Sequence, residues 1–130
     1  MIAGTPFILA DVQDIWPTIC HRLLKTKSPL KTVLAALTKC RHGESICLEG
    51  PDGVVVLTLE PSESAKMRAM VLLAFSSGKA GAFKRNEPSM VAIARDLGAD
   101  ELAFKTDRQG WTHLLGPEWT QDGETFVRSI

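Results

Sequence analysis

The second half of the chain passes from an apolar run into a helical pattern across a short glycine-containing loop. Lys66 to Phe75 is apolar and typical of a strand, and the loop Ser76 to Ala82 follows directly. Beyond the loop, an apolar face recurs at helical spacing through Met90, Val91, Ile93, Ala94 and Leu97. Gly98 ends this helix, and Glu101 to Thr106 has the character of a short strand. A strand, a helix and a strand in this order predict a right-handed parallel crossover.

Two helices are predicted in the first part of the chain. The first is expected over about residues 15 to 25, with Asp14 as N-cap and Pro17 in the first turn. The second begins at Ser28-Pro29 and is closed by Gly43 in a left-handed conformation. Its apolar stripe consists of Leu30, Val33, Leu34 and Leu37.

Strands are predicted between and after these helical segments. Ser45 to Glu49 and Val54 to Glu60 flank the turn cluster Gly50 to Gly53, which predicts a hairpin. With residues 66 to 75 the hairpin extends to an antiparallel meander of three strands. Near the end of the chain we expect a short helix around Trp111 and a closing strand over Thr125 to Ile130.

These elements predict one α/β (α+β) domain over residues 1–130, with a mixed central sheet and the order ααβββαβαβ. A chain of 130 residues with 45% hydrophobic content suits a single core. We see no linker, repeat or low-complexity tract that would divide it.

Charge and apolar patterning exclude several classes of function. Fifteen basic and fifteen acidic residues give a formal net charge of zero, which makes nucleic acid an unlikely partner. No stretch approaches the roughly 20 apolar residues of a membrane span, and we expect a soluble, intracellular protein. The odd number of cysteines, without framework spacing, predicts reduced thiols at Cys20, Cys40 and Cys47.

Metal and nucleotide chemistry are weighed and set aside on spacing. Cys20-His21 and the group Cys40, His42 and Cys47 lack the paired Cys-x2-4-Cys spacing of structural zinc sites, so no metal is expected. Neither a GxxxxGK[ST] loop nor a GxGxxG motif occurs. A Cys-His hydrolase pair at Cys47 is disfavoured because no helix N-terminus adjoins it to stabilise a thiolate.

The order of elements resembles the GNAT acyl-CoA N-acyltransferase fold over nearly the whole chain. The motif-like part is the later half, with its glycine loop at Gly78 to Gly81, the helix over Met90 to Leu97, the strand over Leu102 to Thr106 and the turn Arg108-Gln109-Gly110-Trp111. In this part it is similar to small GNAT-like proteins of bacteriophages and prophages. The resemblance implies a host-cytoplasmic protein that is also a candidate for incorporation in the virion.

The same resemblance implies where coenzyme A would bind. The family places bare backbone and a helix N-terminus against the pyrophosphate, which here corresponds to Gly78, Lys79, Ala80, Gly81 and Ala82. Two starts of the following helix stay open: near Glu87, with Pro88 in the first turn, or near Ala82, with Pro88 inside the helix. Only the second keeps the helix N-terminus next to the glycines.

The family's catalytic pattern is incomplete in this sequence. Aligning its small-residue positions to Gly78 and Ala80 puts Phe75 where the family has a polar residue, and the chain has no tyrosine to act as general acid. His113, Thr112, Glu101 and Glu60 are the groups weighed for proton transfer, and none is assigned a catalytic role.

We therefore predict a phage protein that lacks a cofactor and acts without catalysis in virion structure or assembly, through other phage structural proteins or self-association. The alternative is an acetyl-CoA-dependent N-acetyltransferase of unknown acceptor. An enzyme predicts an open cleft between the strands ending at Phe75 and Thr106, and a structural protein predicts side chains there; Phe83, Arg85 and Trp111 are the residues that discriminate. Trp16, Trp111 and Trp119 are core residues by default, and Trp119 is a candidate for partial exposure and for an interface.

Overall fold

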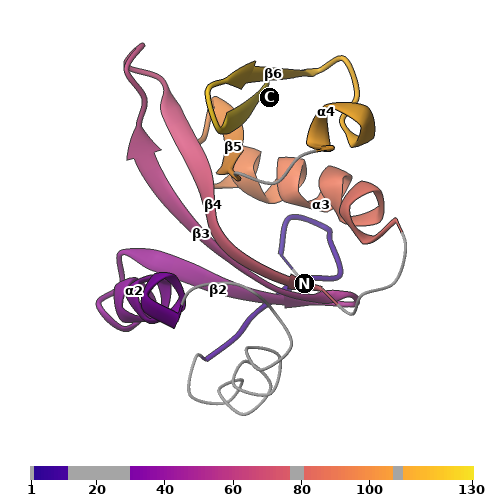
Figure 1. Ribbon diagram of the computed structural model, residues 1–130. Helices are drawn as coiled ribbons and strands as arrows, with labels where there is room; N and C mark the ends of the chain where they lie inside the picture. Colours follow the sequence, from indigo (N-terminus) through magenta and orange to yellow (C-terminus); the bar gives the residue numbers. More distant parts are fainter. Residues whose placement is uncertain (1, 12–29, 77–80, 107–109) are drawn as a thin grey trace.

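The computed structural model describes residues 2–11, 30–76, 81–106 and 110–130 (Figure 1). The helix predicted over 15 to 25, with Trp16 and Cys20, lies outside these residues. The described elements, in chain order, are β1 (Ile8–Leu9), α2 (Leu30–Arg41), β2 (Ser45–Gly50), β3 (Gly53–Pro61), β4 (Met67–Ser76), α3 (Ala82–Asp96), β5 (Glu101–Lys105), α4 (Trp111–Leu114), β6 (Trp119–Asp122) and β7 (Thr125–Ser129).

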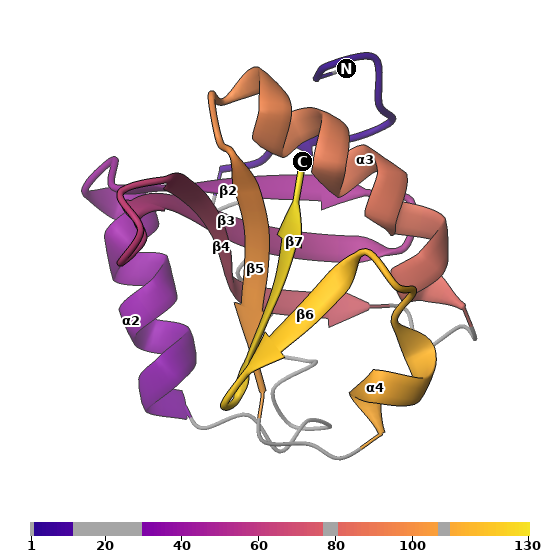
Figure 2. The same ribbon diagram turned by 90° about the horizontal axis from the view of Figure 1, so that it is seen from above.

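The strands form one mixed seven-stranded sheet in the order β1-β2-β3-β4-β5-β7-β6. The predicted meander is confirmed: β2 and β3 pair antiparallel up to Gly50 and Gly53 at the turn, and β3 pairs antiparallel with β4. The predicted parallel pair is confirmed as β4 and β5. Figure 2 shows β5, β7 and β6 side by side and turned steeply relative to β2 and β3. The mixed α+β architecture is thus the predicted one.

Two strands were not predicted. β1 has two residues, too few to show an alternating pattern, and its pairing with β2 joins segments far apart in sequence. β6 has Trp119 buried and its next three residues exposed, so it too lacks alternation. Both strands are identified by their hydrogen-bonded neighbours rather than by their own residues.

Helices α2 and α3 cover opposite faces of the sheet (Figure 1). On the α2 face, Ala36 and Leu37 pack with residues of β2 and β3, namely Cys47, Val54 and Val56. On the α3 face the core continues in two clusters that run from β2 to β7, centred on Leu48, Leu57, Ile93, Ala94, Leu102 and Phe126. The alternation of strand residues between these two cores is the period-2 pattern that the sequence displays.

The predicted helix ends are confirmed, with one correction in the apolar stripe of α2. Gly43 and Gly98 follow their helices with φ of +75° and +86°, in the left-handed region. Leu37 is buried, but Leu34, predicted beside it, is 44% exposed. Ala36, one residue before Leu37, is buried instead.

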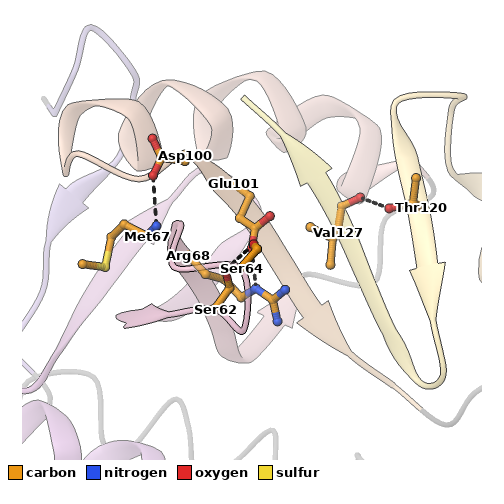
Figure 3. Close-up of polar contacts among 8 residues, drawn as sticks. All are labelled: Ser62, Ser64, Met67, Arg68, Asp100, Glu101, Thr120 and Val127. Atoms are coloured by element: carbon orange, nitrogen blue, oxygen red, sulfur yellow. Dashed lines mark hydrogen bonds and ion pairs between the residues drawn. The ribbon is translucent and has the colours of Figure 1, made fainter.

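Strands β4 and β5 are joined over a short seam at their N-terminal ends. The register pairs run from Arg68 with Glu101 to Val71 with Phe104. Asp100 accepts a hydrogen bond from the backbone N–H of Met67 at 2.9 Å, and Arg68 Nε lies 2.9 Å from Glu101 Oε1 (Figure 3). β4 then continues to Ser76 beyond this pairing.

Candidate functional site

The first turn of α3 is the part of the predicted cofactor loop that the structure describes. α3 begins at Ala82, so the start near Ala82 is confirmed and the start near Glu87 is wrong. Pro88 lies inside the helix, where it has no N–H to donate to the carbonyl of Lys84. Gly78, Lys79 and Ala80 lie outside the described residues.

Gly81 is the N-cap of α3 and adopts φ of +77° and ψ of +9°, a left-handed conformation that favours glycine. The backbone N–H of Arg85 donates to the Gly81 carbonyl at 3.0 Å, which closes the first helical bond. Gly81 has no side chain to cap this end, and the first turn contains no acidic residue. Neither of the usual side-chain devices that stabilise a helix start is therefore present at this N-terminus.

Arg85 is held by Asp52, which lies in the turn between β2 and β3. Arg85 Nη2 donates to Asp52 Oδ1 at 2.9 Å, and Nε donates to Oδ2 at 3.3 Å. The Asn86 side-chain amide donates to the same Oδ2 at 2.9 Å. The bond to Asp52 raises the pKa of the Arg85 guanidinium above its usual range. Two successive residues of α3 thus converge on one carboxylate of the β2–β3 turn.

The β2–β3 turn is fixed on its other side by the N-terminal segment. Phe7 is buried, and its ring packs so closely over Gly50 that a Cβ at that position would lie 2.6 Å from the ring carbon Cζ. Glycine is therefore required at position 50 for steric reasons. The segment before β1, the β2–β3 turn and the first turn of α3 form a continuous set of contacts.

Aromatic side chains fill the space between the start of α3 and the C-terminal elements. The Phe83 ring contacts Trp111 of α4 at a centroid distance of 5.3 Å and Phe104 of β5 at 5.9 Å. Phe104 also contacts Trp111 at 4.9 Å and Trp119 at 5.4 Å. Figures 1 and 2 both place α4 beside the beginning of α3. We call Phe83, Phe104, Trp111, Trp119 and Phe126 the aromatic cluster.

A partly buried polar contact joins α3 to the last two strands. Glu87 Oε1 accepts a hydrogen bond from Trp119 Nε1 at 2.6 Å and from Arg128 Nη1 at 2.7 Å. Trp119 is 9% exposed, so the alternative of a partly exposed Trp119 is wrong. Its ring packs in the core, and its N–H has a charged acceptor within the protein.

β4 carries an irregularity next to the end of its seam with β5. Val56 pairs with Leu73 and Leu57 pairs with Val71, so the register between β3 and β4 shifts at Leu72. An extra residue in one strand bends that strand and increases its local twist. The bend coincides with the point beyond which β5 no longer pairs with β4.

The groups weighed for proton transfer lie in two separate places. His113 is exposed on α4, and Thr112 beside it is exposed as well. Glu101 is 7% exposed and paired with Arg68. The two residues lie at the end of the β4–β5 seam where both strands begin. Glu60 lies across from Arg68 on β3, which places it at that same end.

The thiols and the acidic groups form no evident reactive or metal centre in the described part of the chain. Burial raises the pKa of Cys47 to about 12, with smaller contributions from Cys40 and Glu49, so this thiol stays protonated. Among the described residues there is no cluster of three His, Cys, Asp or Glu side chains that could hold a metal ion. No helix within those residues has the length and apolar character to cross a membrane.

Sequence reasoning singled out Phe83, Arg85 and Trp111 and missed Asp52, Glu87 and Arg128. Asp52 was assigned only as a turn residue, and its partner Arg85 is 33 positions away. The concentration of aromatic residues at positions 83, 104, 111, 119 and 126 was the available signal for a cluster in the second half.

Comparisons with known proteins identify the fold. No protein-family model matches the chain, and no curated protein matches it in sequence. Among solved structures, a chain of the NatC complex bound to Gag peptide and CoA superposes with a TM-score of 0.59 at 13% identity, over 95% of this chain and 97% of that one. Arabidopsis thaliana Naa50, in complex with the bisubstrate analogue CoA-Ac-MVNAL, superposes with a TM-score of 0.54 at 11% identity, again over 95% and 97%. Both are GNAT acetyltransferases, and this chain has the GNAT-like fold.

Proposed function

We propose that this chain is a GNAT-fold protein that acts through protein contacts and not as a catalyst, in the structure or assembly of a phage virion. The phage assignment rests on the resemblance of the second half to small phage GNAT-like proteins. The non-catalytic assignment rests on the arrangement around the start of α3. The contact between the rings of Phe83 and Trp111, at 5.3 Å, is the observation that carries it.

The aromatic cluster supports this proposal because it fills space that a cofactor would need. A ligand running from the end of β4 past the N-terminus of α3 toward α4 would meet Phe83 and Trp111. Phe104 closes the same region from β5, since its ring contacts both of the others. Burying such large rings against one another is strongly favourable, so separating them would cost a ligand much of its binding energy.

The engagement of Arg85 supports the proposal independently. This residue is the described cation of the first turn best suited to a bidentate phosphate contact. Its guanidinium already makes two bonds to the Asp52 carboxylate. A phosphate would have to compete with an anion that is covalently part of the protein and held in place by the β2–β3 turn.

One observation favours the alternative of an acetyl-CoA-dependent N-acetyltransferase. β4 leaves its pairing with β5 after Val71, and its register shifts at Leu72. Diverging parallel strands offer backbone groups to an extended ligand, and the fold matches acetyltransferases over nearly the whole chain. In that case Gly81 and Ala82, with Gly78, Lys79 and Ala80, would hold the pyrophosphate.

Calorimetric titration with acetyl-CoA separates the two functions. The wild-type protein is titrated beside Gly81→Glu, which places a carboxylate and a disfavoured conformation at the start of α3. Gly123→Glu is the matched control, because Gly123 also has a positive φ, of +62°, but lies in the β6–β7 turn.

We expect no heat of binding for any of the three proteins up to millimolar acetyl-CoA. Micromolar binding by the wild-type and Gly123→Glu proteins that Gly81→Glu abolishes would overturn the proposal and establish the cofactor loop. Micromolar binding retained in all three proteins would overturn it too, and would place the ligand elsewhere.

A further inference from the structure

The first turn of α3 has little local reason to be helical. Its N-cap is a left-handed Gly81 without a side-chain hydrogen bond, whereas N-caps ordinarily adopt extended backbone and offer a side-chain acceptor. Lys84 and Arg85 place positive charge near the positive end of the helix dipole, and the first turn itself contains no acidic residue. Residues 82–86 therefore depend on contacts from elsewhere in the protein.

Pro88 supplies a second, competing start for the same helix. Proline is favoured in a first turn because its fixed φ suits the helix and its missing N–H breaks no bond there. Inside α3 the same residue leaves the Lys84 carbonyl without its helical donor. A helix that begins at Glu87 has neither the uncapped, positively charged first turn nor a carbonyl left without its donor by Pro88. Considered locally, residues 82–86 are therefore less stable as helix than residues 87–96.

Tertiary contacts on residues 83, 85 and 86 hold the longer helix. From residues of α3, Asp52 accepts two hydrogen bonds of Arg85 and one of Asn86, and its side chain is only 14% exposed. The Asn86 amide also donates to the Ala82 carbonyl at 2.8 Å, which links Asp52 to the first residue of the helix. Phe83 is held separately by the aromatic cluster.

We propose that residues 82–86 are a conditional first turn of α3, latched in the helical state by Asp52, and that release of Asp52 moves the start of the helix to Glu87. The two states are the two helix starts that the sequence itself permits. In the released state Phe83 and Arg85 no longer lie in the helix. The space between α3 and α4 opens as Phe83 leaves Trp111. This change of helix start does not depend on whether the protein binds coenzyme A.

Hydrogen exchange resolved by residue tests the latch, because the two helix starts differ in which backbone N–H groups have a helical acceptor. The variant Asp52→Asn keeps the shape of the side chain and removes its charge. We expect the amides of residues 85–87 and 89 to exchange roughly tenfold faster, with residues 90–96 unchanged, because only the helical bonds to carbonyls before Asn86 are lost. Glu101→Gln is the matched control, since it neutralises the carboxylate partner of Arg68 outside α3.

A second variant separates a two-state helix start from a simple loss of stability. Pro88→Ala restores the missing N–H and removes the competing start, so the double variant Asp52→Asn/Pro88→Ala should regain slow exchange at residues 85–87 and 89. Unchanged exchange in Asp52→Asn would overturn the proposal, as would faster exchange throughout α3. Failure of Pro88→Ala to restore protection would equally refute it.

Discussion

At the scale of single residues, burial decides which side chains have unusual chemistry. Cys47 is 3% exposed on β2, beneath α2, and its neutral thiol is the stable form there. Arg85 is exposed, and its pKa is raised by the bond to Asp52 instead of by its surroundings. The pKa of the Cys47 thiol is thus set by burial in the core, and that of the Arg85 guanidinium by its bond to Asp52.

The raised pKa of Cys47 predicts a loss of stability in alkaline solution. The pKa is about 12 in the folded protein against 9.0 for an unperturbed thiol, so between these values only the unfolded chain releases the proton. The contribution of this thiol to the free energy of unfolding is complete well below pH 9. It decreases as pH rises, by about 1.4 kcal/mol between pH 8 and pH 10.

Urea unfolding of the wild type and of Cys47→Ala at pH 8 and pH 10 measures this effect. The two proteins differ only at position 47, so the difference between them isolates this thiol. The stability advantage of the wild type should shrink by the stated amount. Parallel behaviour of the two proteins would show that Cys47 ionises freely in the folded state.

At the scale of elements, α3 is the connector that ties the two halves of the sheet together. Its first turn contacts the β2–β3 turn through Asp52, and its middle contacts β6 and β7 through Glu87. Its buried face, with Val91, Ile93 and Ala94, packs across the strands between. Substitutions that destabilise α3 should therefore destabilise both halves of the sheet.

Glu87→Ala should destabilise the protein by about 2 kcal/mol, because it leaves Trp119 Nε1 and Arg128 without their shared acceptor. Arg128 is already short of partners, since its Nε is buried with no hydrogen bond in the described structure. Chemical denaturation followed by far-ultraviolet circular dichroism measures the change. Glu124→Ala, at an exposed position of the β6–β7 turn, is the control and should differ from wild type by less than about 0.5 kcal/mol. Equal effects of the two substitutions would contradict the structural role of Glu87.

At the scale of the whole molecule, the edge strand β1 is a candidate site for association with another chain. β1 occupies one edge, and both of its side chains are exposed, Ile8 at 49% and Leu9 at 66%. Natural edge strands are usually protected by charge, proline or covering segments, because their backbone can pair with another chain. Apolar residues at this edge agree with a protein that works through protein contacts.

Leu9→Lys should weaken self-association, since a charge at the sheet edge opposes pairing between chains. Sedimentation velocity at increasing concentration is the measurement, with the wild type expected to sediment faster as concentration rises. Leu114→Lys is the control, because Leu114 is 53% exposed on α4, away from this edge. A wild type that stays monomeric, or equal behaviour of the two variants, would exclude β1 as the contact.

The parts of the fold that the sequence predicts are those with local causes. The β2–β3 hairpin follows from its glycine-containing turn, and the ends of α2 and α3 follow from Gly43 and Gly98. The start of α3 stayed open because Pro88 locally favours a start near Glu87 but does not exclude one near Ala82. Contacts between residues distant in sequence, Arg85 with Asp52 and Phe83 with Trp111, decide it. β1 and the role of Glu87 were missed for the same reason, because both depend on contacts with residues distant in sequence. A local sequence pattern does not indicate such contacts.

The short seam between β4 and β5 sets an order in which the molecule can be assembled. β2, β3 and β4 join neighbours in sequence through turns, so their pairing closes only short loops and can begin while the rest of the chain is still being synthesised. The first pair of the seam, Arg68 with Glu101, joins residues 33 positions apart, and its strand must wait for α3 to be laid across the meander. The C-terminal strands thus pair last, onto the strands already formed.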